Sequence, residues 1–132
     1  MKKIAIMLLC SLFFSCGYFE NDGILSEEGL VGRFEITQDR SDLDKNFQLV
    51  FKNSETSFVG ISQSCKQIIY DSLNKKIFVK EETSKNYFTF KKIVINDLKT
   101  NDILKAYDRK NIKEEDFNLI LNNCKNCIIK NY

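Results

Sequence analysis

The chain has 132 residues, with 20 Lys and Arg against 18 Asp and Glu, and it contains no His, Trp or Pro. A net charge of only +2 provides no basic surplus for nucleic acid, and the absence of His excludes Ser-His-Asp and Cys-His nucleophile systems and removes the commonest zinc ligand. We therefore expect a small non-enzymatic protein with no resident metal or dissociable cofactor.

The first segment, MKKIAIMLLCSLFFSC, has the layout of a secretory signal. Lys2 and Lys3 precede an apolar run, Ile4–Phe14, that ends in the small residue Ser15 and then Cys16. A spanning helix needs roughly 20 apolar residues, and this run is too short for one. We expect residues 1–15 to be removed, which takes away Lys2 and Lys3 and leaves basic and acidic residues in equal number.

The Ser15-Cys16 junction resembles the lipobox of bacterial lipoproteins. In that family the cysteine is coupled to diacylglycerol, the leader is cut just before it, and the new amino terminus is acylated. The match has Phe13 where the family usually has Leu, and Cys10 is a weaker candidate because a large residue precedes it. The resemblance implies a covalent lipid on Cys16 and a location in the bacterial cell envelope, anchored to a membrane and facing the periplasm or the surface; the alternative is an ordinary secreted protein.

Residues 16–29 are rich in Gly, acids and amides, which predicts a tether between the anchor and a single domain of residues 30–132. Alternating apolar residues predict strands at 32–38 and 47–52, followed by strands at 58–61, 67–70, 76–80 and 87–95. Short polar connections between these segments favour an antiparallel meander of about six strands.

The period becomes helical after Asn96. Thr100 or Asn101 could cap a short helix through Tyr107, and Asn111 with Glu114 resembles a capping box. The residues that follow form one apolar helical stripe at i, i+3, i+4 and i+7: Phe117, Ile120, Leu121 and Cys124. The predicted fold class is α+β, an antiparallel meander with one or two C-terminal helices packed on it.

Cys124-Lys125-Asn126-Cys127 is the motif that most resembles a redox or metal-binding site. A redox C-x-x-C is activated at a helix amino terminus, but this pair follows the predicted helix, and the lack of His argues against a zinc site. We therefore expect a structural disulfide among Cys65, Cys124 and Cys127, as in oxidising compartments. The favoured pair is Cys65 with Cys124, because Cys124 lies on the apolar stripe, and it leaves Cys127 free.

Tyr87, Phe88 and Phe90 form an aromatic group on one predicted strand, with Tyr70 and Phe78 on neighbouring strands. Core packing is the favoured role of this group, since aromatic side chains suit strands and a small domain needs apolar area. The alternative is a binding face that includes Tyr70, Tyr87 and Phe88, in which whichever of Tyr87 and Phe88 points outward contacts a partner.

The predicted order over residues 66–95 is a strand, a turn after Tyr70-Asp71, a second strand, and an aromatic strand at Tyr87-Phe88. The helix with the sequence IKEEDFNLIL follows later in the chain. This layout resembles small bacterial lipoproteins of unknown function, some of which act as immunity proteins. The resemblance implies no catalytic residues. We expect a non-catalytic module in the cell envelope that binds an unidentified protein, as an immunity protein or inhibitor; the alternative is a thiol redox or metal-handling protein that uses Cys124 and Cys127.

Overall fold

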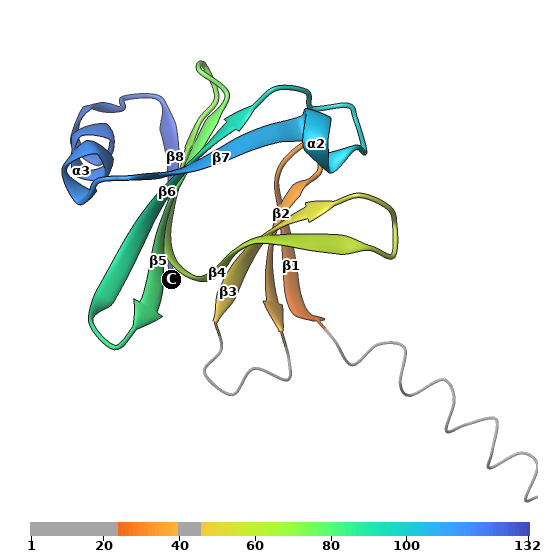
Figure 1. Cartoon of the computed structure of the whole chain (residues 1–132), viewed down its shortest axis with the longest axis horizontal. Coiled ribbons are helices and arrows are strands. Elements are labelled where there is room, and N and C mark those ends of the chain that lie inside the picture. The colour runs from red at the N-terminus through yellow and green to blue at the C-terminus, as the bar shows by residue number, and fades with distance from the viewer. Residues whose placement is uncertain (1–23, 40–45) are drawn as a thin grey trace, which may run out of the picture.

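The structure, a computed structural model, describes residues 24–39 and 46–132, which are mostly antiparallel β-sheet with two short helices (Figure 1). The predicted signal and Cys16 lie outside the described residues. Seven strands follow one another in meander order: β1 (Ile24–Val31), β2 (Phe34–Asp39), β3 (Phe47–Lys52), β4 (Phe58–Asp71), β5 (Lys76–Ser84), β6 (Tyr87–Ile95) and β7 (Tyr107–Ile112). An eighth, β8 (Cys127–Asn131), pairs with β4, and the helices are α2 (Ile103–Ala106) and α3 (Glu114–Asn123).

Strand β4 holds the two halves of the sheet together. Its first part pairs with β3, while its last part lies between β5 and β8. The ladders on both sides of β4 are interrupted near Cys65, and Ser64 there has a φ of +51°. A bulge of this kind bends a strand, and Figure 1 shows β1 to β3 on one side of β4 and β5 on the other, with β7 running across the top between α2 and α3.

The main core lies inside this folded sheet. Phe34 of β2 packs edge-on against Phe51 of β3 at 5.3 Å and against Tyr107 of β7 at 5.5 Å between ring centroids. Arg109 of β7 also donates a hydrogen bond of 2.7 Å from its Nη1 to the carbonyl oxygen of Ile61 in β4. The last strand of the meander therefore curls back over the first half, and the apolar inner faces of both halves are covered.

A second apolar cluster lies on the outer face of the sheet, under α3. Phe117 of α3 is fully buried among Ile69, Phe78 and Phe90, with its ring centroid 5.1 Å from that of Phe90. The predicted packing of the C-terminal helix on the sheet is confirmed by this contact. Among the residues that the structure describes, no helix has the length and apolar character needed to cross a membrane.

Several boundaries differ from the sequence prediction: β2 covers Phe34–Asp39 where 32–38 was expected, and β5 runs on to Ser84 where the expected strand ended at residue 80. Strand β1 begins at Ile24, inside the segment 16–29 that was expected to be a tether, because backbone pairing with β2 outweighs the low strand propensity of its Gly and Glu residues. The predicted strands 58–61 and 67–70 are one strand, β4, whose bulge falls between them. The helix expected to run through Tyr107 ends at Ala106.

Two further strands were not predicted, β7 and β8. Strand β7 reads YDRKNI, with four exposed polar residues between half-buried ends, so it has no alternating apolar pattern. Asn111 belongs to this strand, and the residue before α3 is instead Lys113, which makes no side-chain capping hydrogen bond. The expected capping box is therefore wrong. Asp102, and not Thr100 or Asn101, caps α2 by accepting a hydrogen bond from the Leu104 backbone.

Candidate functional site

The disulfide joins Cys124 to Cys127, with their Cα atoms 5.6 Å apart. Cys124 is the residue at the end of α3, and Cys127 is the first residue of β8. The expected pair Cys65–Cys124 is wrong, because Cys65 faces the main core inside the sheet while α3 lies on the outer face. Cys124 and Cys127 are only three positions apart, so the turn between α3 and β8 is enough to bring them together.

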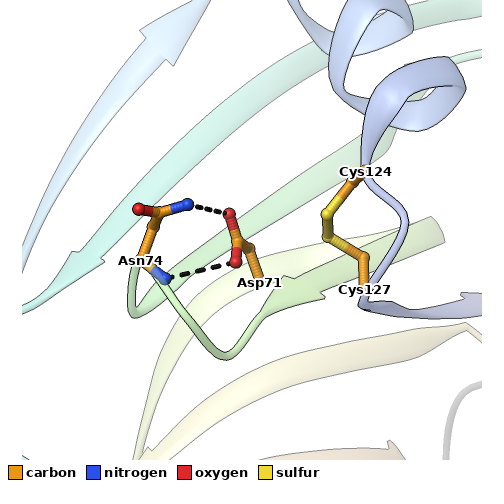
Figure 2. The surroundings of a disulfide bond; sticks show 4 residues. All are labelled: Asp71, Asn74, Cys124 and Cys127. Carbon is orange, nitrogen blue, oxygen red and sulfur yellow. Dashed lines mark hydrogen bonds between the residues drawn. A yellow bond between two sulfur atoms is a disulfide. The ribbon is translucent and has the colours of Figure 1, made fainter.

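Asp71, which the sequence analysis did not single out as a site residue, lies against this disulfide. It pairs in register with Cys127 across β4 and β8, and its carboxylate oxygen and the two sulfur atoms all lie within 4.8 Å of one another. Asn74 donates two hydrogen bonds to this carboxylate, one from its Nδ2 at 2.7 Å and one from its backbone N–H at 3.2 Å (Figure 2). The hydrogen bond from the Asn74 side chain is the main reason that the pKa of Asp71 lies below its ordinary value. The DSLN turn, an Asp with an Asn three residues later, is the sequence signal for this arrangement.

A cavity of about 300 Å³ opens beside the disulfide, between the β4–β5 turn and the end of α3. Its lining comes from both segments: Asp71, Leu73, Asn74, Ile120, Asn123, Cys124, Lys125 and Asn126. The negative end of the helix dipole and the Asp71 carboxylate both disfavour a thiolate at Cys124. The arrangement is therefore unsuited to a nucleophilic thiol, but a reduced pair of thiols with Asp71 would offer two sulfur ligands and one oxygen ligand to a metal ion.

Cys65, the third thiol of the predicted set, is buried in the main core and has no disulfide partner. Its Sγ lies 3.5 Å from the Ser62 carbonyl oxygen, to which it donates. Burial raises the pKa of Cys65 to about 11, so the thiol stays protonated at neutral pH. Ser62 in turn donates to the Glu81 carboxylate, which pairs with Lys91 at 2.6 Å, so this partly buried network is internally satisfied.

The predicted aromatic binding face is divided by the fold. Tyr70 is only 8% exposed and belongs to the main core, as the favoured interpretation has it, so the alternative in which Tyr70 contributes to a binding face is wrong. Phe78 and Phe90 are also core residues, in line with the favoured interpretation of the group. Tyr87 and Phe88 are different, because 70% of Tyr87 and 40% of Phe88 is exposed.

Tyr87 and Phe88 lie at the tip of the β5–β6 hairpin. The β5–β6 pairing continues out to Ser84 and Tyr87, whereas β4 stops pairing with β5 at Glu81 and β7 begins pairing with β6 at Phe90. The tip is therefore a two-stranded projection with no neighbouring strand paired to it in the described sheet. Lys80 places its Nζ 4.4 Å from the centroid of the Phe88 ring, which fixes that ring against the side of the hairpin.

Neither a protein-family model, nor a curated protein, nor a solved structure matches the chain.

Proposed function

We propose that the protein is a lipid-anchored module of the bacterial cell envelope that binds a protein partner through the tip of its β5–β6 hairpin, in the manner of an immunity protein or inhibitor. The exposed Tyr87, next to Phe88 on a projecting tip, is the observation that carries the proposal. Tyr is enriched among the residues that contribute most to protein interfaces, and an exposed aromatic pair loses unfavourable contact with water when a partner covers it.

The proposed anchor is Cys16, in the Ser15-Cys16 junction. Only a short segment separates Cys16 from the first residue of β1, Ile24. Two or more acyl chains hold a protein stably on a membrane, whereas one does so only marginally. The binding module would thus be held close to the bilayer, where its partner must also be present.

A non-catalytic role is supported by the state of the thiols in the described chain. The Cys65 thiol is buried, with its pKa raised to about 11, and the other two are joined in a disulfide. Since the chain also contains no His, the usual means of activating a nucleophile at neutral pH is missing.

Site-specific photo-crosslinking tests the binding surface. A photoreactive residue is placed at position 87 or 88 of the full chain in its native membrane, and a matched control carries it at Leu104, which is 87% exposed on α2. We expect one defined adduct from positions 87 and 88 and none from 104, with mass spectrometry identifying the partner. Equal adduct yields from all three positions would contradict the hairpin tip as the binding surface.

Intact mass tests the anchor separately. The membrane-extracted protein is compared with a Cys16→Ser variant. We expect a mass that fits cleavage before Cys16 plus the attached diacylglycerol and acyl chain, and loss of that mass in the variant. An unmodified chain in the soluble fraction would remove the anchor from the proposal.

The second candidate function is metal handling by the reduced Cys124 and Cys127 thiols, and the proximity of Asp71 favours it. The test is Co²⁺ titration after reduction with a phosphine, in the wild type, Asp71→Asn and a Cys65→Ser control. A thiolate-to-cobalt absorption band that weakens in Asp71→Asn and persists in Cys65→Ser would support this candidate. No band after reduction would exclude it and leave the disulfide as a structural link.

A further inference from the structure

Three lysines line up across three strands on the outer face of the sheet, next to α3. Lys92 of β6 and Lys110 of β7 are direct cross-strand partners. Lys76 of β5 lies diagonally from Lys92, whose own partner on β5 is Phe78. Because side chains two residues apart share a face, all three lysines lie on the face where Phe78 packs under α3.

A cavity of about 310 Å³ connects this lysine row, Lys76, Lys92 and Lys110, to the side of α3. The rest of its lining is mostly apolar: Phe78, Ile112, Leu119, Ile120 and the single acid Asp116. The cavity therefore has a positively charged end and an apolar end, and its volume is at the small end of the range for ligand sites.

The lysine row carries repulsion that nearby carboxylates relieve only in part. Like charges directly opposite each other on two strands are destabilising, and none of the three lysines forms an ion pair with a carboxylate in residues 24–39 or 46–132. Asp71 faces Lys76 in register, and the Lys76 charge helps to lower the pKa of Asp71, but the carboxylate accepts its hydrogen bonds from Asn74 and forms no ion pair with Lys76. Burial, followed by the charges of Lys110 and Lys76, lowers the pKa of Lys92. An anion bound between the three ammonium groups would relieve this repulsion.

We propose that the cavity binds a phosphate monoester with a small apolar group, whose phosphate lies between Lys76, Lys92 and Lys110. A phosphate monoester offers three terminal oxygens and close to two negative charges, which match three ammonium donors better than a carboxylate does. The apolar group fills the part of the cavity formed by Phe78, Ile112 and Leu119. The ester can come from a soluble compound or from a lipid such as phosphatidic acid, since both present the same head group.

The test is calorimetric titration of the full chain in zwitterionic detergent with 1-naphthyl phosphate, inorganic phosphate and 1-naphthol. We expect naphthyl phosphate to bind more tightly than either of its parts and to weaken as the ionic strength rises. Lys92→Gln and Lys110→Gln should each weaken it by about tenfold, because each removes one charge-assisted contact. The matched control is Lys99→Gln, an exposed lysine outside the cavity, and it should change the affinity less than about twofold.

Thermal unfolding of the same variants separates lost binding from lost folding. Lys92→Gln removes a repelling charge, so its melting temperature should stay the same or rise, and Lys110→Gln changes an exposed side chain. Unchanged affinity in both variants, or naphthol binding as tightly as naphthyl phosphate, would overturn the proposal.

A second titration with short-chain phosphatidic acid identifies the source of the ligand. Tighter, lysine-dependent binding of the lipid than of naphthyl phosphate assigns the site to a membrane lipid, and the reverse assigns it to a soluble ester. Failure of both compounds to bind refutes the site, and it does so without bearing on the partner surface at Tyr87.

Discussion

Phe47 and Tyr132 stack on each other, with ring centroids 4.3 Å apart and an interplanar angle of 30°. The contact joins the first residue of β3 to the last residue of the chain. The two strands lie end to end along one edge of β4, where β3 pairs as far as Cys65 and β8 pairs from Gln67 onward. The Tyr132 backbone N–H donates to the Lys66 carbonyl oxygen at 2.9 Å, which bridges the gap between them.

Substitutions of Tyr132 separate its ring from its hydroxyl group. Tyr132→Ala loses the stacked ring and should lower the free energy of unfolding by about 2 kcal/mol, because the side chain is half-buried. The Tyr132 hydroxyl is buried without a hydrogen-bond partner in the described residues, so Tyr132→Phe should leave stability unchanged or raise it by up to about 1 kcal/mol. Urea unfolding measures both. A loss above about 1 kcal/mol in Tyr132→Phe would show that the hydroxyl is bonded.

Stability should fall at alkaline pH because of Cys65. Burial raises the pKa of this thiol from an ordinary 9.0 to about 11. The protonated thiol is thus favoured in the folded state, and the stability it contributes is complete below pH 9 and is lost as the pH rises from about 9 to about 11. Urea unfolding between pH 8 and pH 11 should show a smaller decline in Cys65→Ala than in the wild type. Equal declines would mean that Cys65 ionises as readily in the folded chain as in the unfolded one.

The central strands could be predicted from the sequence because alternate apolar residues point to the same face of the sheet: in β5, Ile77 and Val79 belong to the main core and Phe78 to the cluster under α3. In β3, Leu49 and Phe51 both belong to the main core, as the period-two pattern requires, although Val50 between them is buried as well. Phe117 occupies the predicted inner side of α3. Strands β1 and β7 escaped prediction because they are held mainly by backbone pairing, which accepts polar side chains. Strand β8 is five residues long and begins after a short turn that follows α3, so it leaves too short a pattern to recognise.

The candidate site was predictable only where it depended on local sequence. The exposure of Tyr87 and Phe88 depends on how far β4 and β7 extend along the hairpin, and the burial of Tyr70 depends on strand register. The proximity of Asp71 to the disulfide requires β8 to pair with β4. Cys16 was identified from its neighbours alone, but it lies outside the described residues, so its lipidation stays a prediction.

Reduction of the Cys124–Cys127 disulfide should weaken the fold without unfolding it. The bond closes a loop with a sequence separation of only 3, for which chain entropy predicts a cost of about 2 kcal/mol. Helix α3 should stay on the sheet, because Phe117 remains buried among Ile69, Phe78 and Phe90. Urea unfolding with and without a phosphine, and of Cys124→Ala with Cys127→Ala, measures the effect. Loss of Phe117 burial on reduction, seen as hydrogen exchange in α3, would contradict the expectation.

Substitution by glycine should have opposite effects on stability at two adjacent residues of β4, Ser64 and Gln63. Ser64 has a φ of +51°, a conformation that costs a residue with a Cβ about 1 kcal/mol and costs a β-branched residue more. Ser64→Gly should therefore raise the free energy of unfolding by about 1 kcal/mol, and Ser64→Val should lower it by about 1 to 3 kcal/mol.

Gln63 is the matched control for this bend. It is exposed in the same strand and is not among the described residues with a positive φ. Gln63→Gly should lower the free energy of unfolding by about 0.5 to 1 kcal/mol, because Gly loses more backbone entropy when it is fixed in a strand. Thermal or urea unfolding of the three variants gives the comparison. Equal destabilisation by Ser64→Gly and Gln63→Gly would mean that Ser64 does not have a left-handed backbone conformation in the folded protein in solution. The proposed cause of the bend in β4 would then be wrong.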